Sequence, residues 1–179
     1  MITDPLGDAL LSSAPGYVDV RSAGVSEGAD AFSFVATLAA PIPSSAEVPE
    51  DWDGLLWSFC LDTHGSSAPS GYPFAATMVV PCEFIVTALS KGDEVAGSLI
   101  DRRPLLHAQR ATTTPIPVAL DGSTMTISVP AAKLGHPTKF TWVMATTALT
   151  LPLPNDDFQD IDEVPDSSFD KPARWPAGA

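Results

Sequence analysis

The sequence predicts an all-β fold: an antiparallel β-sandwich of jelly-roll type with about eight strands and minimal helix. Three observations support this prediction. The 179 residues include 18 prolines and 12 glycines, a density that interrupts long helices and is typical of a chain with many turns. Apolar and polar residues alternate in several short runs, as they do in strands with one buried face. Turn residues separate these runs without intervening helices, which favours a sandwich over a parallel α/β sheet, although a closed barrel has the same periodicity.

The clearest element is a β-hairpin at Asp121-Gly122, because both residues tolerate a positive φ and alternating runs flank them at 116–120 and 123–129. A second hairpin is expected around Lys91-Gly92-Asp93. The remaining predicted strands are residues 17–21, 32–38, 55–62, 83–89, 95–100 and 140–147.

Alternation within three of these strands assigns one face of each to the core. The predicted core residues are Phe32, Phe34, Ala36, Leu38, Trp57, Phe59, Leu61, Phe140, Trp142 and Met144. One helical turn, Ala131–Leu134, is predicted before Gly135, which is suited to close it. Residues 41–54 and 64–81 do not fit strands and are expected to be long loops, the usual place for ligand contacts on a rigid sandwich.

The length of the chain suits one well-buried core, so we expect a single domain. We place the ligand-binding sandwich at residues 1–168 and an acidic, proline-containing tail at residues 169–179. The composition of that tail is typical of a solvated terminus.

The net charge of −13 comes from 22 acidic and 9 basic residues, and it would repel nucleic acid and anionic membranes. Cations and neutral ligands such as carbohydrate remain as expected partners. No run approaches the ~20 apolar residues that membrane insertion requires. The start Met1-Ile2-Thr3-Asp4 is not that of a signal peptide, which leaves an intracellular protein as one alternative. Scarce lysine and abundant serine, threonine and proline favour the other alternative, an extracellular or cell-surface domain, free-standing or part of a larger surface protein.

Two cysteines, Cys60 and Cys82, fall on separate predicted strands. They can form a disulfide only if those strands are neighbours or face each other. The alternative is two buried free thiols that pack as small hydrophobic side chains.

Several short strings occur in order along nearly the whole chain. They are Asp4-Pro5-Leu6-Gly7-Asp8, Tyr17-Val18-Asp19-Val20, residues 57–63, Gly71-Tyr72-Pro73-Phe74, residues 118–122, residues 129–135 and Phe140-Thr141-Trp142. Together they resemble the DOMON-like β-sandwich superfamily, which includes the family 9 carbohydrate-binding modules. The resemblance implies a sandwich that binds a sugar or haem. Family 9 modules clamp their sugar between two tryptophans, and in this chain a second loop tryptophan is not evident apart from Trp175.

Calcium is the expected cofactor, because it takes six to eight oxygen ligands from carboxylates, carbonyls and water. Pro5 and Gly7 can fold the segment from Asp4 to Asp8 back on itself and bring the two carboxylates together. The alternative for both is an Asx-type turn. The full set of predicted metal ligands is Asp4, Asp8, Asp19, Asp162 and Asp166.

Aromatic side chains in loops suit a sugar ligand, because the apolar face of a pyranose stacks on them. Trp52, Tyr72 and Phe74 lie in the predicted loops and are the candidates, although Trp52 could equally be a lid over one end of the sandwich. Arg102 and Arg103 complete the predicted ligand site, because the planar guanidinium of one of them could hold a carboxylate or sugar hydroxyls. Pairing with the acidic surface is the alternative role of these arginines.

We therefore expect a non-catalytic, calcium-stabilised module that recognises carbohydrate. A structural or adhesive surface domain that binds a protein is the first alternative, and a small β-fold cyclase or isomerase with an apolar cavity is the second. The sequence has no G-x-S-x-G nucleophile motif. Haem ligation would need Met78 or Met144 with His107 or His136, and it is not expected because Met144 alternates with core residues.

Overall fold

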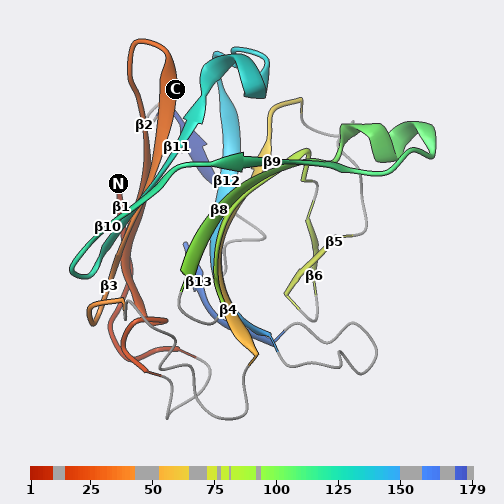
Figure 1. Ribbon diagram of the computed structural model, residues 1–179. Coiled ribbons are helices and arrows are strands. Elements are labelled where there is room, and N and C mark those ends of the chain that lie inside the picture. The colour runs from red at the N-terminus through yellow and green to blue at the C-terminus, as the bar shows by residue number, and fades with distance from the viewer. Residues whose placement is uncertain are drawn as a thin grey trace.

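The computed structural model describes residues 1–9, 15–42, 53–64, 72–75, 78–80, 82–91, 94–149, 159–165 and 172–176. Two antiparallel sheets face each other across one hydrophobic core (Figure 1). Within these residues the structure has two short 3₁₀ helices and no α-helix. The predicted all-β sandwich is therefore confirmed.

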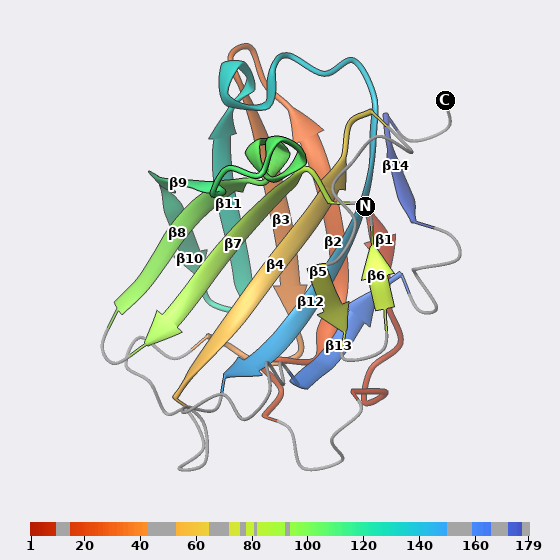
Figure 2. The same ribbon diagram turned by 90° about the vertical axis from the view of Figure 1, so that its right-hand side faces the viewer.

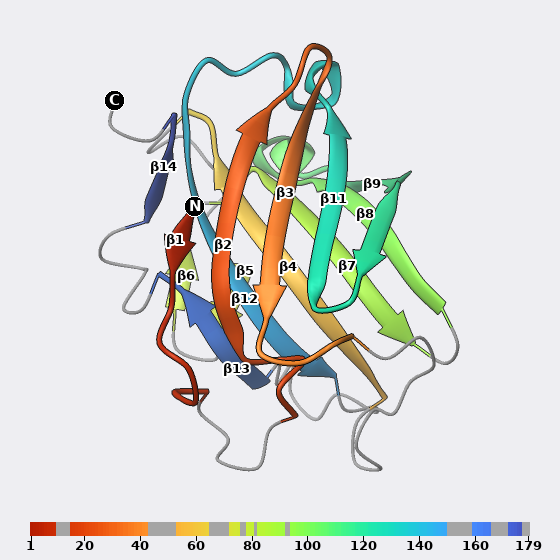
Figure 3. The same ribbon diagram turned by 90° about the vertical axis from the view of Figure 1, so that its left-hand side faces the viewer.

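The smaller sheet has five strands in the order β1-β2-β3-β11-β10 (Figure 3). Its strands are β1 (Ile2–Thr3), β2 (Val20–Glu27), β3 (Ala31–Leu38), β10 (Val118–Asp121) and β11 (Thr124–Pro130). The larger sheet has the order β13-β12-β4-β7-β8-β9, and β14 also pairs with β12 (Figure 2). Its strands are β4 (Gly54–Asp62), β7 (Phe84–Lys91), β8 (Glu94–Asp101), β9 (Thr112–Ile116), β12 (Phe140–Leu149), β13 (Gln159–Val164) and β14 (Ala173–Trp175).

A separate two-stranded sheet, β5 (Tyr72–Ala75) and β6 (Met78–Val80), lies against the outer side of the larger sheet (Figures 1 and 2). The prediction that residues 64–81 form only a loop is wrong for these two strands. Pro73 and the short runs of apolar residues hide the strand pattern, because alternation cannot be recognised over three or four residues.

The core between the sheets contains every core residue that alternation predicts. Its aromatic side chains pack edge to face or tilted, with ring centroids 5.3 Å apart for Phe34 and Phe59 and 5.7 Å apart for Phe59 and Trp142. Trp57 is buried, and its indole Nε1 donates to the carbonyl of Tyr17 at 3.1 Å. Burial therefore leaves no polar atom of this large side chain without a partner.

Both predicted hairpins are confirmed, with one change in the first. Asp121 pairs with Thr124, so the turn residues are Gly122 and Ser123 rather than Asp121 and Gly122. Gly122 has φ of +58°, and Ser123 is not among the described residues with positive φ. Positive φ at the first turn residue alone is the pattern of a type II′ turn, which needs glycine there, whereas type I′ needs positive φ at both.

The predicted strand 116–120 crosses from one sheet to the other. Ile116 ends β9 in the larger sheet, and Val118 begins β10 in the smaller sheet. Pro117 between them has no amide proton to give to either ladder, and its fixed φ suits the corner. Gly97 of β8 permits this crossing, because an added Cβ would lie 2.4 Å from the carbonyl oxygen of Ile116.

The first predicted strand, residues 17–21, is displaced. Strand β2 begins at Val20 and continues to Glu27, while Tyr17 to Asp19 lie in a turn before it. The reason is tertiary: the carbonyl of Val18 accepts from the hydroxyl of Thr146 at 2.8 Å, as that of Tyr17 accepts from Trp57. These residues therefore bond to side chains of the larger sheet instead of to a neighbouring strand.

Among the described residues beyond position 150, two strands pair with β12. Strand β13 pairs with Met144–Ala148, and β14 pairs with Phe140–Trp142. Ala173 of β14 is buried, and Trp175 packs on the core residues Phe32 and Phe140. Residues 172–176, which the sequence analysis assigned to the tail, thus form part of the sandwich.

The predicted helical turn is confirmed at η2 (Ala131–Leu134), which is a 3₁₀ helix that Gly135 ends with φ of +77°. A second 3₁₀ helix, η1 (Arg103–His107), was not predicted. Within the part of the chain that the structure describes, no helix is long and apolar enough to cross a membrane.

Candidate functional site

The two terminal parts of the chain meet at an acidic cluster formed by Asp4, Asp8 and Asp162. One carboxylate oxygen of each lies within 4.8 Å of the others. Asp4 and Asp162 are almost buried, at 9% and 4% exposure, and Asp8 is exposed. The segment after β1 and strand β13 lie at the same edge of the sandwich, where β13 contacts β2 (Figure 3).

The segment from Asp4 to Asp8 is held in a turn by the start of the smaller sheet. The amide of Asp4 donates to the carbonyl of Arg21 at 2.9 Å, and the amide of Gly7 donates to Oδ2 of Asp19 at 2.9 Å. Gly7 has φ of +78°, a conformation that favours glycine. The local sequence Pro-Leu-Gly thus folds back between the two carboxylates.

Asp19 lies beside the cluster but is not one of its three converging carboxylates. Its Oδ2 accepts the Gly7 bond, and its Oδ1 is buried without a hydrogen-bond partner among the described residues. A buried carboxylate oxygen without a partner is costly unless an ion or water meets it.

Three carboxylate oxygens at this spacing could hold a hard divalent cation. Two ligands on opposite sides of a calcium ion, each at about 2.4 Å, are about 4.8 Å apart. Asp4, Asp8 and Asp162 would hold the ion, with Asp19 as a neighbouring carboxylate, and backbone carbonyls and water would supply the remaining ligands. Asp166, the fifth predicted ligand, lies outside the described residues.

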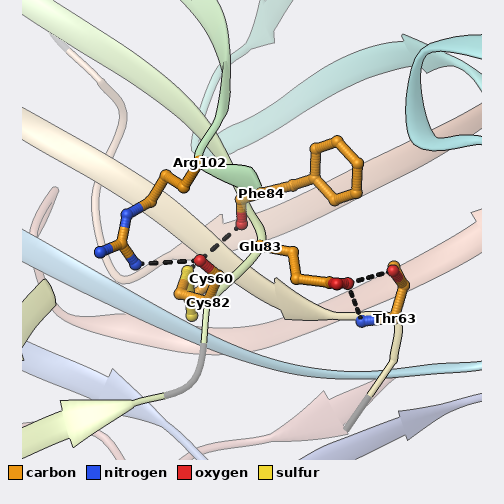
Figure 4. Close-up of a disulfide and its surroundings, with 6 residues drawn as sticks. All are labelled: Cys60, Thr63, Cys82, Glu83, Phe84 and Arg102. Carbon is orange, nitrogen blue, oxygen red and sulfur yellow. Dashed lines mark hydrogen bonds between the residues drawn. A yellow bond between two sulfur atoms is a disulfide. The ribbon is translucent and has the colours of Figure 1, made fainter. Parts of the chain in front are cut away.

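The predicted ligand-binding residues are not brought into one described surface. Trp52 lies outside the described residues, and Tyr72 and Phe74 belong to strand β5 rather than to a loop. Arg102 is only 4% exposed, and its guanidinium Nη1 donates to the carbonyl of Cys82 at 2.9 Å (Figure 4). This position leaves Arg102 little surface for a ligand.

Arg103 pairs with Asp101, with Nη2 2.6 Å from Oδ2 and Nε 2.9 Å from Oδ1. Burial raises the pKa of Asp101, but hydrogen bonds from the side chain and backbone of Arg103, together with its charge, outweigh burial and hold this pKa below its usual value. The guanidinium of Arg103 also lies 4.5 Å from the centre of the Phe84 ring. Arg103 therefore has the alternative role of pairing with an acidic side chain.

Cys60 and Cys82 form a disulfide on the outer face of the larger sheet (Figure 4). Cys60 lies on β4, and Cys82 lies just before β7, the neighbour of β4. Both sulfurs are buried with Ile85, Val143 and Ala145 in a second apolar cluster. The condition for a disulfide, that the two strands are neighbours, is thus met.

A cleft of about 520 Å³ opens at the end of the sandwich where β4 ends and β12 begins. Its lining combines the aromatic side chains of Phe140 and Trp175 with charged and hydroxyl groups. The lining residues are Asp62, Thr63, His64, Lys139, Phe140, Thr141, Arg174, Trp175 and Pro176. No pattern in the sequence predicts this site. The alternation of Ala173, Arg174 and Trp175 could have indicated a final strand, but three residues are too few for a reliable pattern.

One wall of the cleft is fixed by a buried glutamate. Glu83 is 3% exposed, and its carboxylate lies 2.9 Å from Nδ1 of His64. The amide of Thr63 donates to Glu83 at 2.8 Å, and the hydroxyl of Thr63 also donates to this carboxylate (Figure 4). The end of β4 is therefore bonded to the start of β7 by several hydrogen bonds on one carboxylate.

Comparison with protein-family models, with curated proteins and with solved structures finds no match to this chain. The acidic cluster and the cleft are therefore interpreted from their own chemistry.

Proposed function

We propose that the chain is a non-catalytic binding module that is stabilised by calcium and recognises carbohydrate outside the cell. The observation that supports the calcium part is the convergence of Asp4, Asp8 and Asp162 within 4.8 Å. Three carboxylates at this spacing repel one another when ionised, and a divalent cation among them removes that repulsion. The buried Oδ1 of Asp19 beside the cluster supports the same interpretation.

The ion would stabilise the fold because it links segments that are far apart in the chain. Asp4 and Asp8 follow the first strand, and Asp162 lies on β13 of the opposite sheet. A ligand that binds only the folded state adds RT ln(1 + [L]/Kd), which is about 2.7 kcal/mol at a hundredfold excess over Kd. Calcium would thus hold both sheets together at this edge.

The cleft supports the carbohydrate part of the proposal. It offers one half-buried indole, that of Trp175, and polar groups around it that can pair with hydroxyls. Its volume of about 520 Å³ lies within the usual range of small-ligand sites. The disulfide between Cys60 and Cys82 supports a place outside the cell, because such bonds persist in oxidising compartments.

Two measurements test the proposal that calcium binds: thermal unfolding with calcium or with a chelator, and titration calorimetry of the metal-free protein. We expect millimolar calcium to raise the melting temperature by several degrees. Magnesium should have a smaller effect, because it requires a tighter octahedral shell and keeps its waters. Melting curves that coincide with calcium and with chelator would show that the cluster binds no ion.

Two substitutions locate the ion. Asp8→Asn removes the exposed carboxylate of the cluster and should abolish the calcium effect, while the melting temperature in chelator stays equal or rises slightly. Glu94→Gln is the matched control, because Glu94 is an exposed acid on β8, from which β7, β4 and β12 separate β13 in the larger sheet. A calcium effect that survives Asp8→Asn, or that disappears in Glu94→Gln, would contradict the proposed site.

A further inference from the structure

The cleft at the end of the sandwich gathers positive charge in a strongly acidic protein. Lys139 and Arg174 line it and are exposed, and neither has an ion pair with any residue that the structure describes. The chain has only 9 basic residues against 22 acidic ones. At physiological salt, charges further away than about 8 Å are largely screened, so a bound ligand experiences these two cations more than the net charge of −13.

Three adjacent strands place the charged groups in register. Thr141 of β12 lies opposite Asp62 of β4 on one side and opposite Arg174 of β14 on the other. Side chains at paired positions of neighbouring strands point to the same face of a sheet. The row Asp62, Thr141, Arg174 thus places a hydrogen-bond acceptor, a hydroxyl and a guanidinium side by side on rigid elements, which lowers the entropic cost of binding.

The aromatic wall of the cleft is fixed in place by the core. The ring of Trp175 stacks on that of Phe140, with centroids 5.1 Å apart and planes inclined by 23°, and it lies nearly perpendicular to the ring of Phe32, with centroids 4.9 Å apart. Trp175 is half-buried and also lines a second cavity of about 330 Å³ beside the first. It therefore offers an immobilised apolar surface to a ring-shaped ligand.

His64 also lines the cleft. Its Nδ1 lies 2.9 Å from the buried carboxylate of Glu83, and a carboxylate accepts the proton that Nδ1 carries. When the ring carries its only proton on Nδ1, Nε2 is an acceptor suited to a hydroxyl. The lining of the cleft thus combines two exposed cations, groups that can accept from hydroxyls, and one half-buried indole.

We propose that this cleft binds an acidic sugar, a pyranose that carries a carboxylate. The sugar ring stacks on Trp175, and its carboxylate pairs with Arg174 and Lys139. The hydroxyls of the sugar form hydrogen bonds with Asp62 and His64. Arginine is the favoured partner because its planar fork can donate two parallel hydrogen bonds to a carboxylate. This inference rests on the proposed carbohydrate function and adds the class of sugar and the location of the site.

The test is binding of the calcium-saturated protein to an array of oligosaccharides built from uronic acids and of neutral oligosaccharides with the same linkages. We expect the uronic acid members to be retained and the matched neutral members to bind at least tenfold more weakly. Rising salt should weaken retention of the uronic acid members, because their carboxylates pair with exposed cations.

Arg174→Gln should reduce binding to the uronic acid members by about tenfold or more. Arg110→Gln, which removes another exposed arginine that does not line the cleft, should leave binding to the uronic acid members unchanged. Binding that is confined to neutral members would contradict the inference that the ligand is an acidic sugar, but it would agree with the proposed carbohydrate function. Binding of uronic acids that Arg174→Gln does not reduce would overturn the location, and no binding to any member would overturn both the inference and the carbohydrate function.

Discussion

The side chain of Asp162 accepts a hydrogen bond from the backbone amide of Val20, with Oδ2 2.6 Å from the nitrogen, although the two residues are 142 positions apart in the chain. Asp162 belongs to β13 of the larger sheet, and Val20 begins β2 of the smaller sheet. Both residues are buried, so the bond satisfies a backbone donor that water cannot reach. One carboxylate thus links the sheets and also belongs to the acidic cluster.

This bond predicts a difference between two substitutions of Asp162. Asp162→Ala leaves the amide of Val20 buried without an acceptor, which should cost about 1–3 kcal/mol. Asp162→Asn keeps an acceptor oxygen and removes one repelling charge, so it should cost much less. Denaturant unfolding in chelator measures this difference without the contribution of calcium. Equal midpoints for the two variants would show that the bond contributes nothing to stability.

Trp142→Ala should lower the free energy of unfolding by about 3–5 kcal/mol, because removal of a buried indole leaves a large cavity. Trp142 is 3% exposed and packs on Phe59. Leu106→Ala is the control, because Leu106 is 52% exposed and should cost little. Chemical denaturation of both variants checks the prediction, which a small loss for Trp142→Ala would contradict.

Gly97→Ala should destabilise the protein by about 1–3 kcal/mol, since the new Cβ overpacks the crossing between the sheets. The carbonyl oxygen of Ile116 and Cγ2 of Val118 would lie 2.4 and 2.5 Å from this atom. Gly28→Ala is a matched control, because its Cβ would have its nearest neighbour, the carbonyl oxygen of Ala31, at 3.4 Å. Melting temperatures that fall equally in both variants would show that the crossing does not depend on glycine.

Reduction of the disulfide should lower the free energy of unfolding by roughly 2–4 kcal/mol, because a loop of this size is then free in the unfolded chain. Cys60 and Cys82 are separated by 22 positions. Urea denaturation with and without a reductant measures the loss, and mass spectrometry after thiol alkylation shows the redox state of each sample. Identical midpoints for the oxidised and reduced protein would rule out a stabilising role.

The pair of Asp101 and Arg103 should stabilise the fold at neutral pH and lose its effect in acid. Because the pKa of Asp101 is lowered in the folded state, its contribution is complete above the unfolded value, near 4, and is lost as the pH falls through the lower folded value. Asp101→Asn should therefore lose less stability than the parent protein on acidification. Parallel acid limbs in the two stability profiles would contradict this prediction.

The sequence was sufficient to predict the central strands, because each of them is long enough for a strand pattern to be recognised. Phe32 to Leu38 alternates between core and partly exposed positions over seven residues, whereas Trp142 to Ala148 is buried on both faces of its sheet. Short strands such as β5, β6 and β14 could not be predicted, since three or four residues carry no periodicity. Their pairing is decided by tertiary contacts, as when Trp175 packs on Phe32 and Phe140.

The acidic cluster and the cleft also differ in how far the sequence alone predicts them. Asp4 and Asp8 share a local turn, so their proximity follows from the sequence between them. The cleft depends on the register of three strands, which places Asp62 and Arg174 on either side of Thr141 although they lie far apart in the chain. Register is set by packing of the whole sheet, so no local pattern reveals this juxtaposition.

The outer edge of the larger sheet at β9 contains Pro115, which pairs with Ser98 of β8 and is followed by the crossing at Pro117. Proline has no amide proton, so this five-residue strand cannot offer a continuous row of donors to a foreign chain. The same prolines that made helices improbable thus protect an exposed margin against intermolecular strand addition. Such protection favours a protein that remains dispersed at high concentration, and substitution of Pro115 by threonine would make this margin a template for aggregation.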